Sequence, residues 1–348
     1  MSEVRSRSFI WIELIRIIAI FGVVLIHVSS PFSANFDPAD LAGWWFANAY
    51  GSLFRNCVPL FFMLSGYLLL KKNENLEVFF NKRFSKILIP FVFWSLFYLF
   101  WKVYVDNWED DFFAGFKKLL HTPAYYHLWF LYSLVTLYFI IPVLRFVTVN
   151  STNSILVYFL GGWFLAAFIV PILYDKVGFA WDFDFRFFTG YSGYLILGYW
   201  LGNLDIKPRQ VQIAVFTFSL AYLVTIFGTH SVSMESGYTN EYFYENFSLT
   251  VLAMAASQFI FLKYWFERIE WTNSGSKIQA LGGLAFGIYL IHPLIITILS
   301  QGRLGIVVDV SKMDASYGVP LMGLLVFLLS AGLTWVLQKT PVIEKIVP

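Results

Sequence analysis

The chain has 348 residues, of which 58% are hydrophobic and 13% are charged, and its formal net charge is +2. A soluble domain averages about 45–50% apolar and about 25% charged residues, so this composition leaves too little polar surface for a water-soluble globule. The small net charge argues against a nucleic-acid partner, and the single cysteine, Cys57, excludes an internal disulfide framework. The composition predicts an integral membrane protein built as one polytopic domain, residues 1–348.

Apolar stretches long enough to cross a bilayer recur along the whole chain. A transmembrane helix needs about 20 mostly apolar residues. Ten segments fit that length, at roughly 9–30, 48–70, 84–105, 125–148, 154–174, 185–204, 210–229, 245–266, 279–300 and 317–338. We therefore expect an all-α membrane protein with about ten transmembrane helices.

The basic residues predict the orientation, because Lys and Arg are retained in short cytoplasmic loops. With the N-terminus in the cytoplasm, the inner side holds Arg5, Arg7, Lys71, Lys72, Lys82, Arg83, Lys86, Arg145, Lys207, Arg209, Lys263, Arg268, Lys277, Lys339 and Lys345. The outer side holds only Arg55, Lys102, Lys117, Lys118, Lys176, Arg186, Arg303 and Lys312. This asymmetry places both termini in the cytoplasm.

The first segment carries ionisable residues within an apolar helix. Arg16 and His27 are 11 residues apart, which is about 20° past three full turns, so they share one face roughly 16 Å apart. One interpretation is an ion pair between Glu13 and Arg16 at i, i+3 together with a core histidine. We favour a polar cavity, because two ionisable groups on one stripe of a membrane helix usually line one.

The second segment begins near Arg55, which lies close to the outer end and could simply extend toward the membrane surface. Ser65 and Gly66 follow in the same segment. Small residues of this kind allow close helix packing, which explains the pair as well as a functional role does.

Cations gather at the inner end of the third segment. Lys82 and Lys86 are four residues apart and would share a helix face, with Arg83 beside them. The cluster is either ordinary positive-inside charge or an anion site that binds phosphate.

Two further histidines, His127 and His292, are expected in the outer half of the membrane at a depth similar to that of His27. Each could be a hydrogen-bonded packing residue. Three histidines can bind zinc, but no carboxylate lies near His292 in the sequence, and we predict no metal site.

Together these residues resemble the acyltransferase-3 family of membrane acyltransferases. Arg16 and His27 match its Arg-x10-His signature, and further segments agree in order: VPLFFMLSGYLLL at 58–70, KRFSKILIP at 82–90, HLWFLYSLVTLYFIIPVLR at 127–145, SGYLILGYWLG at 192–202 and GIYLIHP at 287–293. The resemblance covers residues 9 to about 338. Within the family the chain is most similar to stand-alone bacterial surface-polysaccharide O-acetyltransferases, such as the enzyme that acetylates the enterobacterial common antigen. Lysines replace the usual arginines at positions 82 and 86, which keeps the charge but loses bidentate geometry.

The resemblance implies a cytoplasmic acyl-CoA donor, usually acetyl-CoA, as co-substrate, with no tightly bound cofactor. It implies a carbohydrate hydroxyl, free or lipid-linked, as acceptor at the outer face of a bacterial cytoplasmic membrane. Lys82, Arg83, Lys86, Ser65 and Arg16 would then bind the donor along its route.

His27 and Arg16 are the catalytic residues that the resemblance implies. His27 would act as general base or as an acetylated nucleophile, because neutral imidazole can take a proton from a sugar hydroxyl. Arg55, His127 and Tyr194 are candidate donors to the oxyanion. With His292, they are also candidates for binding the acceptor.

Two other functions fit parts of the pattern. A secondary transporter or flippase for a lipid-linked sugar would use Arg16 and His27 as a proton or substrate path. A catalytically inactive membrane sensor would not need His27 at all. Release of free CoA in the presence of an acceptor distinguishes an acyltransferase from the transporter, and an intact cellular role after replacement of His27 would indicate the sensor.

Overall fold

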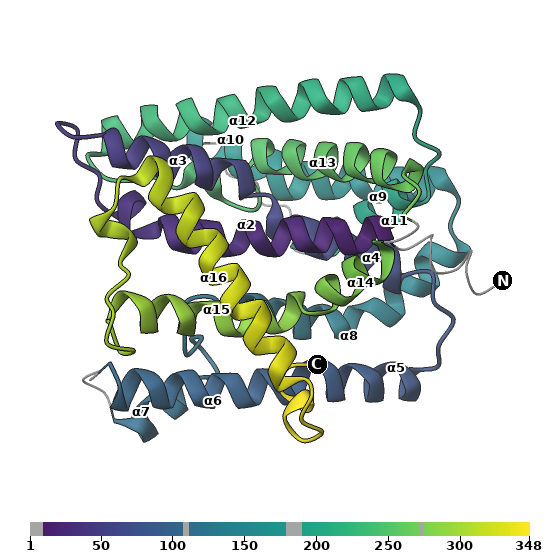
Figure 1. Ribbon diagram of the computed structural model, residues 1–348. Coiled ribbons are helices and arrows are strands. Elements are labelled where there is room, and N and C mark those ends of the chain that lie inside the picture. Colours follow the sequence, from purple (N-terminus) through teal and green to yellow (C-terminus); the bar gives the residue numbers. More distant parts are fainter. Residues whose placement is uncertain (1–9, 107–110, 179–189, 272–273) are drawn as a thin grey trace.

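The computed structural model describes residues 10–106, 111–178, 190–271 and 274–348, and the regular elements within these ranges are all helices (Figure 1). In chain order they are α2 (Ile10–Ala34), α3 (Ala42–Phe54), α4 (Cys57–Leu69), α5 (Leu76–Arg83), η1 (Phe84–Leu88), α6 (Ile89–Tyr104), α7 (Phe112–Lys118), α8 (Trp129–Asn150), α9 (Asn153–Phe164), η2 (Leu165–Ile169), α10 (Val170–Val177), α11 (Ser192–Gly202), α12 (Pro208–Ser236), η4 (Tyr242–Tyr244), α13 (Leu249–Arg268), α14 (Gly275–Gly283), α15 (Ala285–Ser300), η5 (Val310–Lys312), α16 (Ala315–Leu337) and η6 (Ile343–Lys345).

The predicted segments correspond to these helices. Within the described residues, eight helical stretches are long and apolar enough to span a membrane, and α14 with α15 forms a ninth that is bent by 55°. The segment expected at 185–204 appears as α11, and its first residues, 185–189, lie outside the described residues. The prediction of an all-α polytopic membrane protein is confirmed.

Several spans are irregular, and prolines explain two of the irregularities. The π-helical turns η1 and η2 each directly precede a helix whose second residue is a proline, Pro90 in α6 and Pro171 in α10. Proline has no backbone N–H for the carbonyl four residues earlier, and its ring clashes with that carbonyl, so the preceding turn widens. Two other spans are interrupted, at Arg55–Asn56 between α3 and α4 and at Leu284 between α14 and α15.

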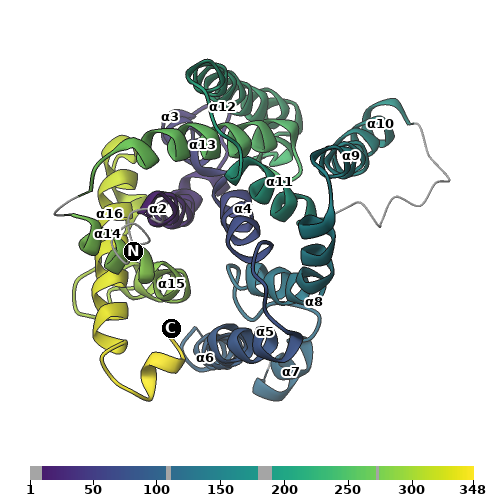
Figure 2. The same ribbon diagram turned by 90° about the vertical axis from the view of Figure 1, so that its right-hand side faces the viewer.

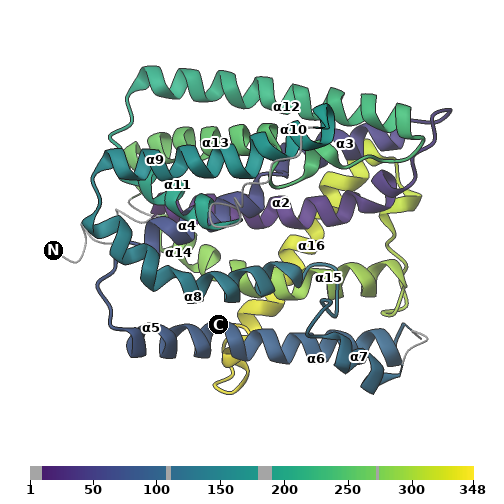
Figure 3. The same ribbon diagram turned by 180° about the vertical axis from the view of Figure 1, so that it is seen from behind.

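The helices lie side by side, with α12 and the α5–α6 stretch on opposite sides of the bundle (Figure 1, Figure 3). Viewed along the helices, α2, α4, α8 and α15 surround the centre, and α9 with α10 lies at the edge (Figure 2). The last long helix, α16, crosses the others obliquely.

The outer surface of the bundle is apolar, as a lipid-facing surface must be. Large side chains on α8, α12 and α16 point outward, among them Phe139, Phe146, Phe216 and Leu328, each more than half exposed. Exposed apolar area of this extent is rare on soluble monomers and is typical of a membrane-embedded surface.

The closest helix packing is between α4 and α11. A Cβ atom at Gly66 would collide with the carbonyl group of Leu195, and one at Gly198 would collide with the backbone of Met63. Small residues let membrane helices approach at backbone distance. The packing interpretation of Gly66 is therefore confirmed, and it places the neighbouring Ser65 at a fixed position beside the bundle centre.

Candidate active site

A cavity of about 380 Å³ lies at the centre of the bundle, within the size range of small-molecule sites. Its walls come from α2, α4, η1, α8, the segment before α13 and the bend between α14 and α15. The lining residues with polar or ionisable groups are Arg16, His27, Arg55, Cys57, Ser65, His127, Trp129, Tyr138, Tyr244, Asn246 and Tyr289.

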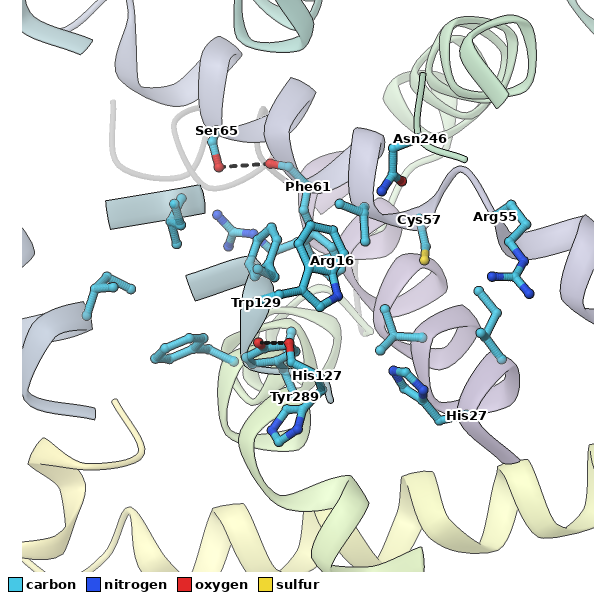
Figure 4. Close-up of a pocket in the computed structure, with 18 of the residues that line it drawn as sticks. Arg16, His27, Arg55, Cys57, Phe61, Ser65, His127, Trp129, Asn246 and Tyr289 are labelled. Carbon is cyan, nitrogen blue, oxygen red and sulfur yellow. Dashed lines mark hydrogen bonds between the residues drawn. The ribbon is translucent and has the colours of Figure 1, made fainter. Parts of the chain in front are cut away.

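Arg16 and His27 both line this cavity from α2 (Figure 4). Arg16 also forms the expected pair with Glu13, with 2.7 Å between Nη1 and Oε1. The two interpretations of Arg16 are therefore both satisfied, because its charge is compensated by Glu13 and it still lines the cavity.

Glu13 is itself held against the bend in the ninth span. Its carboxylate packs on Gly282, where any Cβ atom would collide with it. Because Gly282 and Gly283 also line the cavity, the Glu13–Arg16 pair joins α2 to the point where α14 gives way to α15.

The three histidines lie together, with His27 and His127 lining the cavity and His292 in contact with both. The His27 ring stacks on the His292 ring, with centroids 5.3 Å apart and planes 25° apart, and the His127 ring meets His292 edge-on at 5.5 Å. Within the described residues, no group of three His, Cys, Asp or Glu side chains has an arrangement that could hold a metal ion. The rings are therefore packed face or edge against one another, and their nitrogens do not surround a common point.

The backbone fixes the protonation of His292. Its Nδ1 lies 2.8 Å from the carbonyl oxygen of Tyr289 and 3.1 Å from that of Ile288, and a carbonyl can only accept, so Nδ1 carries the hydrogen. The other nitrogen, Nε2, is buried without a partner. His292 does not line the cavity, and its ring stacks against the ring of His27, which does.

His127 is placed differently. Both of its ring nitrogens are buried without a hydrogen-bond partner, and the residue lines the cavity. Its backbone carbonyl accepts a hydrogen bond from the Tyr289 hydroxyl at 2.6 Å, which fixes the short segment before α8 (Figure 4). An imidazole in this state is available to a ligand.

Tyr194 lies outside the cavity. It is fully buried, its ring packs edge-on against Trp163, and its hydroxyl donates to the backbone carbonyl of Asn246 at 2.5 Å. Tyr194 therefore holds the segment that brings Asn246 to the cavity wall. Ser65 does line the cavity, with its hydroxyl donating within its own helix to the carbonyl of Phe61 at 2.8 Å (Figure 4).

The comparisons identify the type of chemistry. A family model described as an acyltransferase domain matches residues 9–339. The chain belongs to this acyltransferase family. No curated protein and no solved structure matched the chain. With its membrane helices, the protein is a multi-pass membrane acyltransferase, and its closeness to any one subgroup stays a prediction.

In this acyltransferase, the carboxylate of Glu74 forms ion pairs with the cations at the start of the third span. Glu74 accepts a hydrogen bond from Lys82 at 2.8 Å and one from Arg145 at 3.0 Å, and Arg83 lies 3.6 Å away. The hydrogen bond from Lys82, followed by that from Arg145 and by the charge of Arg83, lowers the pKa of Glu74 to about 2.

The predicted shared face of Lys82 and Lys86 is altered by the π-helical turn η1, which begins between them at Phe84 and changes the residues per turn. Lys86 is exposed and lies outside the cavity lining. Arg83 lines a small cleft whose walls include Ile87 and Tyr138, and these two residues also line the central cavity. Arg83 is thus the cation of the cluster that borders the cavity.

Proposed function

We propose that this acyltransferase moves an acetyl group from cytoplasmic acetyl-CoA to a hydroxyl of a surface or lipid-linked polysaccharide sugar at the outer face of a bacterial cytoplasmic membrane. The observation that carries the proposal is one cavity that is lined by both Arg16 and His27. A ligand can therefore contact both residues of the Arg-x10-His signature at once.

The donor enters from the cationic end. Lys82 and Arg83 face the CoA phosphates, and Lys86 adds charge at the exposed surface, because phosphate binding needs cations that are accessible from the cytoplasm. The pantetheine arm then passes Ile87, Ser65 and Arg16, which all line the cavity. Its thioester ends beside His27.

The proposed chemistry is direct acyl transfer with His27 as general base. The imidazole takes the proton of the acceptor hydroxyl while that oxygen attacks the thioester carbonyl, and a tetrahedral oxyanion forms. When the carbon–sulfur bond breaks, the protonated imidazole returns the proton to the departing thiolate and CoA leaves as a thiol. The ester on the acceptor is the other product.

His127 and His292 support this step in different ways. His127 donates a hydrogen bond to the oxyanion, since its nitrogens are unpartnered and it lines the cavity. His292 keeps the His27 ring in one orientation by stacking against it while its own Nδ1 is fixed on the backbone.

The experiment that tests the proposal measures thiol release from acetyl-CoA by purified protein in nanodiscs, with a panel of free and lipid-linked glycans. We expect release that depends on an acceptor, and we expect His27→Ala to lower it by about 10²–10⁴-fold because the base is lost. His121→Ala, at an exposed position outside the cavity, is the matched control and should retain full activity.

Two other outcomes would redirect the proposal. If CoA is released slowly without an acceptor and a labelled acetyl group stays on the wild-type protein, the result would indicate an acetyl-histidine intermediate in place of direct transfer. Unchanged release in His27→Ala would contradict the assigned role of His27.

A further inference from the structure

Arg55 lies at the interruption between α3 and α4 and lines the outer half of the cavity. Its side chain is only 18% exposed and lines the same cavity as His27 (Figure 4). Among the described residues that line the cavity, Arg16 and Arg55 are the charged ones.

The two arginines differ in how well their charge is compensated. Arg16 is 2.7 Å from Glu13, whose side chain is 16% exposed. The acid nearest Arg55 is Glu241, at 3.9 Å, and its side chain is 60% exposed, so water screens most of this interaction. The Nε atom of Arg55 is buried without a partner. The outer half of the cavity therefore carries a partly uncompensated positive charge.

Arg55 is also held in place by a rigid support. Its guanidinium carbon is 3.7 Å from the centre of the Tyr244 ring. The Tyr244 hydroxyl donates to Asn48 Oδ1 at 2.6 Å, and the Asn48 amide donates to the carbonyl of Ile226 at 3.0 Å. A cation–π contact of this kind stabilises a guanidinium while leaving its N–H groups free for a ligand.

We propose that Arg55 binds a negatively charged group of the acceptor, a carboxylate or a phosphate, so that the acceptor is an acidic glycan or a glycan carried on phosphate. An arginine in a desolvated site forms strong charge-assisted hydrogen bonds with such groups. Two of its N–H groups can bind two oxygen atoms of one carboxylate or phosphate. Asn246, which lines the cavity near Tyr244, adds an amide for neighbouring sugar hydroxyls. This inference rests on the proposed function, because it names the substrate class of the same site.

The test compares binding of matched probes to wild-type protein in nanodiscs by isothermal titration calorimetry. The probes are octyl β-D-glucoside, octyl β-D-glucuronic acid and octyl β-D-glucoside 6-phosphate, each below its critical micelle concentration. We expect at least one anionic probe to bind about tenfold more tightly than the neutral one, as a desolvated charge pair would produce. A preference for the glucuronic acid identifies a carboxylate source, and a preference for the phosphate identifies a phosphate source.

Three variants locate the effect. Arg55→Gln should abolish the preference for the anionic probe, and Arg55→Lys should keep part of it because the charge remains. Arg303→Gln removes an outer cation whose side chain is 38% exposed and which lies outside the cavity lining, so it should leave the preference unchanged. Retained acetyl-CoA binding shows that each variant is folded.

The inference is overturned if wild-type protein binds no anionic probe more tightly than the neutral one, or if Arg55→Gln keeps the preference. It is also overturned if Arg55→Gln lowers kcat equally for neutral and anionic acceptors with no change in relative affinity, since that would make Arg55 an oxyanion donor only. Transfer to neutral acceptors without anionic preference defeats this inference alone, whereas absence of CoA release with every acceptor defeats the proposed function.

Discussion

The state of each histidine nitrogen determines what the cavity can do. His292 has one nitrogen committed to backbone carbonyls, whereas both nitrogens of His127 are unpartnered and buried. A buried polar group without a partner costs free energy, so its presence in a cavity indicates a ligand that completes the hydrogen bond. In the proposed mechanism, His127 therefore contacts the reacting group and His292 supports His27.

His127→Leu should therefore lower kcat by about 10²–10³-fold, the usual effect of losing one oxyanion donor. The KM for acetyl-CoA should change little, because the donor acts on the transition state. His127→Gln keeps an N–H group of similar reach and should retain more activity than the leucine variant. Steady-state kinetics of CoA release provides both constants. Equal losses in the two variants, or a rise in KM alone, would contradict the role.

The sequence predicted some of these residue positions and missed others. The shared face of Arg16 and His27 follows from helical geometry within one segment, so local reasoning was sufficient. The convergence of His127 and His292 on His27 depends on how three separate spans pack, and no local pattern encodes it. Tyr194 was a candidate ligand residue, but it lies outside the cavity because its hydroxyl is bonded to the backbone at Asn246.

At the scale of helices, close packing of α4 on α11 positions the cavity wall that carries Ser65. Gly66→Ala should destabilise the protein by about 1–3 kcal/mol, because a methyl group at Gly66 would collide with the Leu195 carbonyl and force the helices apart. Thermal unfolding in detergent should show a lower Tm. Gly161→Ala in α9 is the control, since no atom lies within 4 Å of a Cβ there.

An unchanged Tm for Gly66→Ala would show that α4 and α11 are not in backbone contact. The control should keep or slightly raise the Tm, because alanine favours a helix over glycine by up to about 1 kcal/mol.

Glu74, in the connection between α4 and α5, stabilises the fold through its ion pairs. Glu74 has a pKa of about 2 in the folded protein, below the value of about 4.3 of an unperturbed glutamate. Its charged form therefore stabilises the fold at every pH above about 4.3, and this stabilisation is lost as the pH falls toward 2.

Glu74→Gln should accordingly lower the Tm by a constant amount between pH 5 and 8, and the difference from wild type should shrink between about pH 4.3 and 2. Thermal unfolding across this pH range measures it. Glu77→Gln, in the exposed first turn of α5, is the control and should show a smaller difference. A difference for Glu74→Gln that grows with acidification would contradict the assigned ion pairs.

Helix positions could be predicted better than helix irregularities. The apolar segments follow from hydropathy alone, and within the described residues nine of the ten coincide with helical stretches of membrane-spanning length, whereas the segment at 185–204 appears as the 11-residue α11. The π-helical turns before Pro90 and Pro171 depend on how the backbone relaxes around a missing N–H, and this changed the predicted relation of Lys82 to Lys86. Arg145 was counted as one of many inner cations, because its pairing with Glu74 joins α8 to a distant loop.

At the scale of the whole molecule, the proposed function requires acyl transfer across the membrane. The cavity shares Ile87 and Tyr138 with the small cleft that Arg83 lines, and Arg16 and His27 line the cavity from α2. Because donor and acceptor would approach from opposite faces, neither substrate needs to cross the bilayer.

The most direct test is acetyl transfer in sealed proteoliposomes of one orientation, with radiolabelled acetyl-CoA only on the side of Lys82 and the acceptor identified by the release assay only on the opposite side. We expect label on the acceptor with wild-type protein and about 10²–10⁴-fold slower labelling with His27→Ala. Transfer that occurs only when acetyl-CoA and acceptor share a compartment would contradict it.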